Sequence, residues 1–178
     1  MKYFYVLLIL ILTFNITALK SFSMEFMYIL NEENINSSYE KARETIIDTD
    51  IFLIKTPLGL IIRFEIEEPL REYEKLTPKT IKKLNKIENF LAKNKNPVII
   101  EVHIDKKRMH YYFKNWEITT VISNKIADFL KGNKNIKYEN SIFSIGYGEF
   151  LPSNNTSNNG GKINNRVDII ILCNISGE

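Results

Sequence analysis

The sequence contains only one cysteine among its 178 residues, Cys173, close to the C-terminus. A single cysteine excludes an intrachain disulfide, so an oxidising compartment would not stabilise the fold in this way. We expect Cys173 to pack as a small apolar group in the last strand. The fold must therefore rely on its core, and 44% apolar residues are enough to build one in a domain of this size.

Motifs of the common catalytic and metal sites are also missing. The sequence has no HExxH, no GxSxG, no Cys–His pairing and no glycine-rich phosphate loop. On a strand, His103 and Asp105 would point to the same face, as a metal pair or an acid–base couple would. No third ligand is evident, because His110 falls in a lysine-rich loop. We therefore predict that the protein is not an enzyme and uses no cofactor or metal.

Positive charge is not gathered into a stripe. The formal net charge is +3, and Lys2 and Lys20 carry two of these charges in an N-terminal stretch without acids. Elsewhere Lys and Arg are not interleaved with the stacking aromatic side chains that a nucleic-acid groove needs. We do not expect nucleic acid as a partner.

Residues 1–23 have the composition of a targeting segment. Lys2 precedes the apolar run from Tyr3 to Leu12, and the small residues Ser21 and Ser23 provide a cleavage site before Met24. The alternative is a retained membrane anchor, because residues 3–19 reach the lower length limit for crossing a bilayer. Both alternatives predict export, to the periplasm or another part of the cell envelope.

The rest of the chain divides at residue 51. Residues 24–50 are predicted to form a polar linker with a short helix, because Ser37 and Glu40 have the capping-box spacing and an apolar stripe follows. Residues 51–178 are predicted to form the folded domain. We expect four strands there, and they are Leu58–Phe64, Val98–Ile104, Ile142–Tyr147 and Val167–Leu172.

Two helices are expected between these strands. Thr77 is a good N-cap with Pro78 after it, and a stripe of apolar residues then runs to Leu91. The second helix begins near Asn115 and ends before Gly132. Right-handed crossovers would place both helices on one face of a mixed sheet of about four strands. The predicted fold is thus α/β, an α+β two-layer sandwich with the order β-α-β-α-β-β.

Four short motifs occur in order between Ile99 and Asp168. They are IIEVHID, NWEIT at the start of the second helix, GYGEFLP, and NNRVDIII. Together they resemble the OmpA-like, peptidoglycan-associating domains, and the NWEIT element is most similar to the C-terminal part of the flagellar stator protein MotB. The resemblance implies an OmpA-like fold that attaches an envelope or outer-membrane component to the cell wall. Partners that fit this role are peptidoglycan, another envelope protein and a second copy of the chain.

Two residue types missing from the N-terminal segment exclude particular subtypes of this family. Residues 3–19 contain no Asp or Glu, so the proton-conducting role of a stator subunit is not expected. No cysteine lies near the end of the apolar run, which excludes the lipid-anchored subtype of the family.

The resemblance also implies a peptidoglycan-binding site. In the family, an Asp after the second strand and an Arg in the next helix hold the ammonium and carboxylate groups of a diaminopimelate side chain. The Asp corresponds to Asp105, whereas the Arg position is Ile122. Asn115 and Arg166 are retained, and Arg166 and the backbone around Asn115 would contact carboxyl or carbonyl groups of the stem peptide. The other departures from the family pattern are Val102 for Gly, Ile104 for Thr, Ser123 for Ala and Asn165 for Arg.

Two hypotheses explain the missing arginine. In the first, the stem peptide carries a diamine without the distal carboxylate, such as ornithine or lysine, so that Asp105 suffices. In the second, the domain is degenerate, has lost peptidoglycan binding and acts as a structural or protein-interaction module. The second hypothesis predicts an exposed apolar patch around Ile104 and Ile122.

Each candidate residue also has a purely structural interpretation. Asp105 would be a solvated acid or a turn cap, Asn115 a helix cap, and Arg166 the partner of a local acid. Trp116 would pack against the sheet edge, and Ile122 would belong to the core stripe of its helix.

Overall fold

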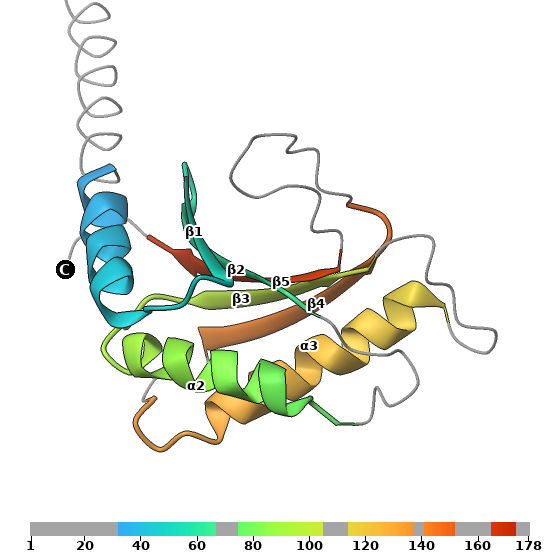
Figure 1. The fold of residues 1–178 in the computed structure, drawn as a ribbon. Coiled ribbons are helices and arrows are strands. Elements are labelled where there is room, and N and C mark those ends of the chain that lie inside the picture. The colour runs from blue at the N-terminus through green and yellow to red at the C-terminus, as the bar shows by residue number, and fades with distance from the viewer. Residues whose placement is uncertain (1–31, 67–74, 105–113, 137–140, 152–164, 174–178) are drawn as a thin grey trace, which may run out of the picture.

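The computed structural model describes residues 32–66, 75–104, 114–136, 141–151 and 165–173 (Figure 1). Its elements, in chain order, are β1 (Ile51–Thr56), β2 (Gly59–Glu65), α2 (Pro78–Leu91), β3 (Val98–His103), α3 (Asn115–Lys131), β4 (Ile142–Gly148) and β5 (Arg166–Leu172). Residues 32–45 are helical as well. None of the helices in these ranges has both the length and the apolar character needed to cross a membrane.

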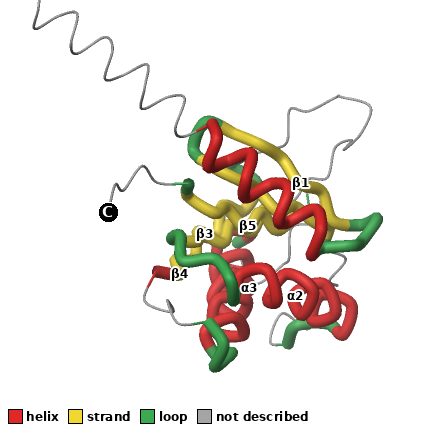
Figure 2. Tube along the Cα trace, turned by 90° about the vertical axis from the view of Figure 1, so that its left-hand side faces the viewer, coloured by secondary structure: helices red, strands yellow, loops and turns green. Residues whose placement is uncertain are grey.

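The strands form one mixed sheet in the order β1-β2-β5-β3-β4. β3 and β4 pair in parallel, and the other neighbours pair antiparallel. The helices α2 and α3 lie against the same face of this sheet, as both views show (Figures 1 and 2). This confirms the predicted two-layer α/β fold.

The sheet has five strands, so the prediction of about four was wrong. β1 was missed because only the two residues Pro57 and Leu58 separate it from β2, and Leu58 continues the apolar pattern of β2. Gly59 follows this two-residue turn with φ of 147°, where a side chain would collide with the backbone of Ile171. The turn lacks the Asn-Gly or Asp-Gly pair that is typical of a hairpin. The predicted strand Leu58–Phe64 therefore began within the turn and covered only β2.

The core lies between the sheet and the two helices. Both predicted helical stripes face it: Leu84, Ile87 and Leu91 of α2 are fully buried, and so is Ile126 of α3. Thr77 caps α2 as expected, since its side chain accepts a hydrogen bond from Thr80 N at 3.2 Å. The central strands contribute fully buried residues in alternation, namely Leu60, Ile62, Phe64, Val98, Ile100, Val102, Val167, Ile169 and Ile171.

The helical residues 32–45 pack against the domain (Figure 1). Ala42 belongs to the hydrophobic core, as does Ile46 just beyond the helix. Lys55 of β1 donates a hydrogen bond to Asn36 at 2.7 Å and lies 4.4 Å from the ring centroid of Tyr39. Because this helix contributes to the core, we propose that the polar linker ends before it rather than at residue 50.

Candidate functional site

The helix α3 begins beside the C-terminal end of β4. Lys114 is the N-cap, and its backbone N–H donates to the carboxylate of Glu117 at 2.8 Å. Asn115 is therefore the first residue of the helix, and its interpretation as the cap was wrong. Its side chain is only 3% exposed, and neither polar atom of the amide has a hydrogen-bond partner in the described structure. A buried amide without partners is unusual, and it can still donate and accept hydrogen bonds.

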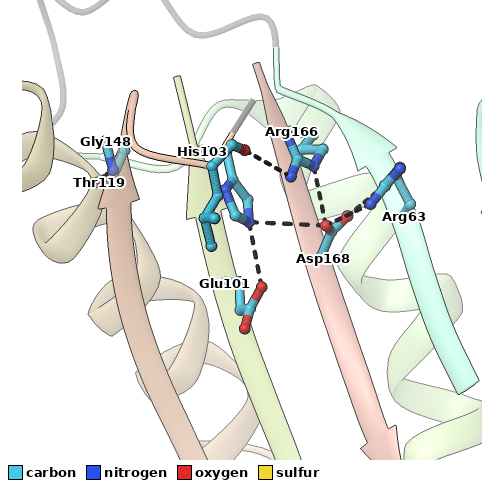
Figure 3. Close-up of polar contacts among 8 residues, drawn as sticks. Arg63, Glu101, His103, Thr119, Gly148, Arg166 and Asp168 are labelled. Atoms are coloured by element: carbon cyan, nitrogen blue, oxygen red, sulfur yellow. Dashed lines mark hydrogen bonds and ion pairs between the residues drawn. The ribbon is translucent and has the colours of Figure 1, made fainter. Parts of the chain in front are cut away.

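Thr119 fixes the start of α3 to the end of β4. Its hydroxyl donates to the carbonyl of Asn115 at 3.0 Å and accepts from the backbone N–H of Gly148 at 2.9 Å (Figure 3). Gly148 has φ of 57°, and a Cβ there would lie 2.8 Å from Trp116 N, so glycine is required for this close approach. The indole of Trp116, which we expected to pack against the sheet edge, is 45% exposed.

Asn115 and Arg166 lie at the same end of the sheet, Asn115 because the start of α3 contacts Gly148, and Arg166 through the sheet register. His103, the last residue of β3, pairs with Arg166 on one side and with Gly148 on the other. Ile104 N then donates to Gly148 O at 2.9 Å. Asp105 comes next in the chain but lies outside the described residues, as does the loop from Pro152 that we expected to close one side. The two described candidates thus flank the strand end that continues into Asp105.

Arg166 takes part in a buried ion network with Asp168 and Arg63 (Figure 3). Arg63 donates from Nε to Oδ1 of Asp168 at 2.7 Å and from Nη2 to Oδ2 at 2.8 Å. Arg166 Nε donates to the same Oδ2 at 3.0 Å, and its Nη2 donates to Leu151 O at 3.1 Å. Arg166 does therefore bind a local acid, but its buried Nη1 has no partner among the described residues.

The two guanidinium groups determine the ionisation of Asp168. Burial alone would raise the pKa of this carboxyl, but the hydrogen bonds and charges of Arg63 and Arg166 outweigh burial and hold the pKa below its usual value of 3.8. Asp168 is therefore a carboxylate at neutral pH, bound on both oxygens.

His103 lies beside this network on the face of the sheet opposite the helices. Its Nε2 is 3.3 Å from Glu101 Oε2 and 3.8 Å from Asp168 Oδ2 (Figure 3). Its ring stacks on that of Tyr147, with 5.1 Å between the ring centroids. Burial raises the pKa of Tyr147, and the charge of Glu101 raises it further. The end of β3, which leads to Asp105, is thus surrounded by packed and charged side chains.

Two potential metal ligands that the sequence did not reveal, Glu101 and Asp168, lie beside His103, whereas the Asp105 of the pair considered from the sequence lies outside the described residues. Glu101, His103 and Asp168 each offer a ligand atom, and these atoms lie within 4.8 Å of one another. Both oxygens of Asp168 already accept hydrogen bonds from guanidinium groups. A metal ion would have to approach two fixed positive charges, so the arrangement is better suited to an ion network than to a metal centre.

Ile104 and Ile122 do not form a surface patch. They are 4% and 2% exposed, and both belong to the hydrophobic core. The patch predicted by the hypothesis of a degenerate module was therefore wrong, and the structural interpretation of Ile122 is confirmed. Because Ile122 points into the core, α3 presents no cation at the position of the family arginine.

Sequence reasoning missed Arg63, Thr119 and Asp168. Arg63 and Asp168 each interrupt an otherwise apolar strand, and two opposite charges in buried strands are a signal for cross-strand pairing. Thr119 gave no such signal, because its role depends on how closely α3 approaches Gly148.

Comparison with known proteins identifies a family model that covers the candidate residues Asp105, Asn115 and Arg166. Residues 71–166 match the model of the OmpA family. A sequence search among curated proteins gave no match. The structure of the cell wall anchor of the T6SS from Pseudomonas aeruginosa is similar, with 17% identity over 75% of this chain and 94% of that chain and a TM-score of 0.58.

Two further solved structures share the fold. A putative MotB-like protein from Desulfovibrio vulgaris has 15% identity over 86% of this chain and 96% of its own, with a TM-score of 0.61. An outer membrane protein from Borrelia burgdorferi B31 has 25% identity over 70% of this chain and 99% of its own, with a TM-score of 0.50.

Proposed function

The chain belongs to the OmpA family, and from this premise we propose that it is a non-enzymatic, peptidoglycan-associating protein of the cell envelope. One observation carries the proposal. Within the segment that matches the family, Arg166 and Gly148 pair with His103 on its two sides, and the start of α3 with Asn115 contacts Gly148, so Asn115 and Arg166 lie on either side of the strand end that precedes Asp105. These are the three residues that the resemblance assigns to peptidoglycan binding.

The proposed ligand is a stem peptide with a cationic side chain. Asp105 would bind the ammonium group, while the Asn115 amide and the free Nη1 of Arg166 would bind carboxyl or carbonyl groups. The last two side chains have unused hydrogen-bonding capacity in the described structure, which supports this assignment. Each charge-assisted contact of this kind contributes about 1.5–3 kcal/mol.

The diamine of this stem peptide would be ornithine or lysine rather than diaminopimelate. Ile122 lies in the core, so α3 supplies no guanidinium for a distal carboxylate. Without that contact, affinity for a zwitterionic side chain would be about tenfold to a hundredfold lower. Weak single-site binding still serves an anchor, because peptidoglycan is a polymer and effective concentration raises the avidity.

The envelope location of this role follows from the same proposal. Residues 1–23 would direct export and then be removed or remain as an anchor that connects the domain to a membrane. One of the similar structures is that of a cell wall anchor, which is in keeping with an anchoring role here.

Co-sedimentation with insoluble peptidoglycan tests the proposal. The full chain should pellet with sacculi from its own source, and Asp105→Asn should reduce the pelleted fraction at least about tenfold, because the ammonium loses its counter-charge. Asp128→Asn is the matched control, since Asp128 is an exposed acid on α3 and should not affect binding.

The possible results separate the two hypotheses. Full sedimentation of the Asp105→Asn chain would refute the role of Asp105. A native chain that never pellets would favour the degenerate module, which keeps the fold and serves as a structural or protein-interaction domain.

A further inference from the structure

A cavity of about 640 Å³ lies between the helical residues 32–45 and the turn that follows α2. Its volume is in the range of sites that hold small molecules. Residues of the helix form one wall, and residues 93–96, which lead from α2 into β3, form the other. Because β3 runs from this turn to His103, the cavity and the candidate site lie at opposite ends of the sheet (Figure 1).

The charged residues of this cavity are mostly lysines. Lys41 comes from the helix, and Lys93 and Lys95 come from the turn. All three are exposed, and within the described part of the chain none of them forms an ion pair. Glu44 is the one acid among the described lining residues, so the lining has a net charge of +2. Like charges that share a cavity repel one another, and an anion between them would relieve this repulsion.

The uncharged lining residues add hydrogen-bond donors. Those with a hydroxyl or amide group include Asn34, Ser37, Ser38, Asn94 and Asn96. Asn94 Oδ1 accepts from Asn96 N at 2.8 Å, which leaves the amide hydrogens of Asn94 for a ligand. Ser38 Oγ accepts from Cys173 Sγ at 3.7 Å, so the hydroxyl proton of Ser38 can still be donated. The cavity therefore offers an acceptor-rich ligand several neutral donors as well as three ammonium groups.

Three carbonyl groups at the end of α2 are hydrogen-bonded within the turn. The oxygens of Glu88, Phe90 and Leu91 accept from the backbone N–H groups of residues 92–94 at 2.8 to 3.1 Å. A carbonyl oxygen repels an anion, and these bonds offset part of the negative charge at this helix end. The lysines beside it therefore dominate the charge of the lining.

We propose that this cavity binds a phosphate group between Lys41 on the helix and Lys93 and Lys95 on the turn. Lysine binds phosphate as a point charge, and charge-assisted hydrogen bonds of this kind are stronger than neutral ones. A phosphate group has more acceptor oxygens than a carboxylate, and it can contact both walls at once. Its oxygens would accept from the lysines and from the hydroxyl and amide donors beside them.

The phosphate can come from a lipid headgroup or from free phosphate in solution. The helix of the cavity follows the N-terminal apolar segment in the chain, and residues 20–31 between them span about 40 Å at most. In a chain that keeps this segment as a membrane anchor, lipid phosphates would be within reach of the cavity. The candidate peptidoglycan site, at the other end of the sheet, would then face away from the membrane.

Heteronuclear NMR titration with inorganic phosphate tests the site, using the full chain in a non-ionic detergent at constant pH and ionic strength. Saturable amide shift changes are expected at Ser38, Lys95 and Asn96. Lys95→Gln should raise the dissociation constant at least about fivefold, because one ammonium contact is lost. Lys82→Gln is the matched control, since Lys82 is an exposed lysine of α2 outside the lining and should leave the constant unchanged.

Glu44→Gln provides a change of opposite sign. Removing the acid of the lining should lower the dissociation constant about threefold, because the anion no longer meets a like charge. Both charge variants are at exposed positions, so both should fold as the native chain does. Equal constants for Lys95→Gln and Lys82→Gln, or weaker binding by the Glu44→Gln chain, would overturn the proposal.

A second probe identifies the source of the phosphate. Glycerophosphoglycerol is the soluble headgroup of phosphatidylglycerol, and it should bind at least as tightly as inorganic phosphate if the cavity holds lipid. Tighter binding of inorganic phosphate would instead assign the same site to the free anion. If neither probe causes saturable shift changes at the cavity, the proposal is wrong.

Discussion

Arg63 and Asp168 face each other on neighbouring strands and bind through two hydrogen bonds, 2.7 and 2.8 Å long. Their side chains are 12% and 4% exposed, so the pair is largely shielded from solvent. Arg166 adds a third hydrogen bond to the same carboxylate. One acid therefore fixes two arginines at the end of the sheet where the candidate site lies.

Replacing Asp168 by Asn should destabilise the fold strongly. The variant keeps the shape of the side chain but leaves the guanidinium groups of Arg63 and Arg166 without a buried counter-charge. We expect the free energy of unfolding, measured by urea denaturation, to fall by about 3–5 kcal/mol. Asp128→Asn, at an exposed site, should change it by less than about 0.5 kcal/mol. A loss below about 1 kcal/mol for Asp168→Asn would show that the network contributes little.

The same carboxylate should make stability depend on pH in the acidic range. The pKa of Asp168 is lowered in the folded protein relative to 3.8, so the unfolded chain binds its proton first as the pH falls. The stabilisation is therefore fully present above the unfolded pKa and is lost as the pH falls through the folded pKa. Urea denaturation between pH 7 and roughly pH 3 should show the difference between native and Asp168→Asn chains shrinking below about pH 4. A difference that stays constant over this range would contradict the assignment.

Thr119 should matter much more than its neighbour Thr120. Thr119→Val has nearly the same shape but removes the acceptor of the buried Gly148 N–H, which should cost about 1–3 kcal/mol of unfolding free energy. The Thr120 hydroxyl donates to Trp116 O at 2.7 Å in an exposed position, so Thr120→Val should cost less than about 0.5 kcal/mol. Chemical denaturation of the two variants side by side makes the comparison, and equal losses would disprove the special role of Thr119.

The architecture could be predicted where one periodicity covered a whole element. The apolar stripes of α2 and α3 were identified because apolar residues recur every three to four positions between the residues that begin and end each helix. β1 was missed because the Pro57–Leu58 turn carries no residue pair typical of a hairpin. The packing of residues 32–45 against the domain was missed because the few apolar residues there also fit a short solvated helix.

The candidate site could be predicted only in part. Asn115 and Arg166 stood out because they belong to motifs that occur in the family's order, and both lie at one end of the sheet. The partnership of Arg63 with Asp168 joins residues 105 positions apart. Only the register of β2 against β5 brings this pair together, and no local pattern contains that register.

The most direct measurement is a heteronuclear NMR titration of the full chain with soluble stem peptides that carry lysine, ornithine or diaminopimelate. The proposed function predicts that the largest amide shift changes occur at Asn115, Gly148 and Arg166, and that the lysine or ornithine peptide binds more tightly than the diaminopimelate peptide. Shift changes confined to the helical residues 32–45, or none at any peptide concentration, would contradict it.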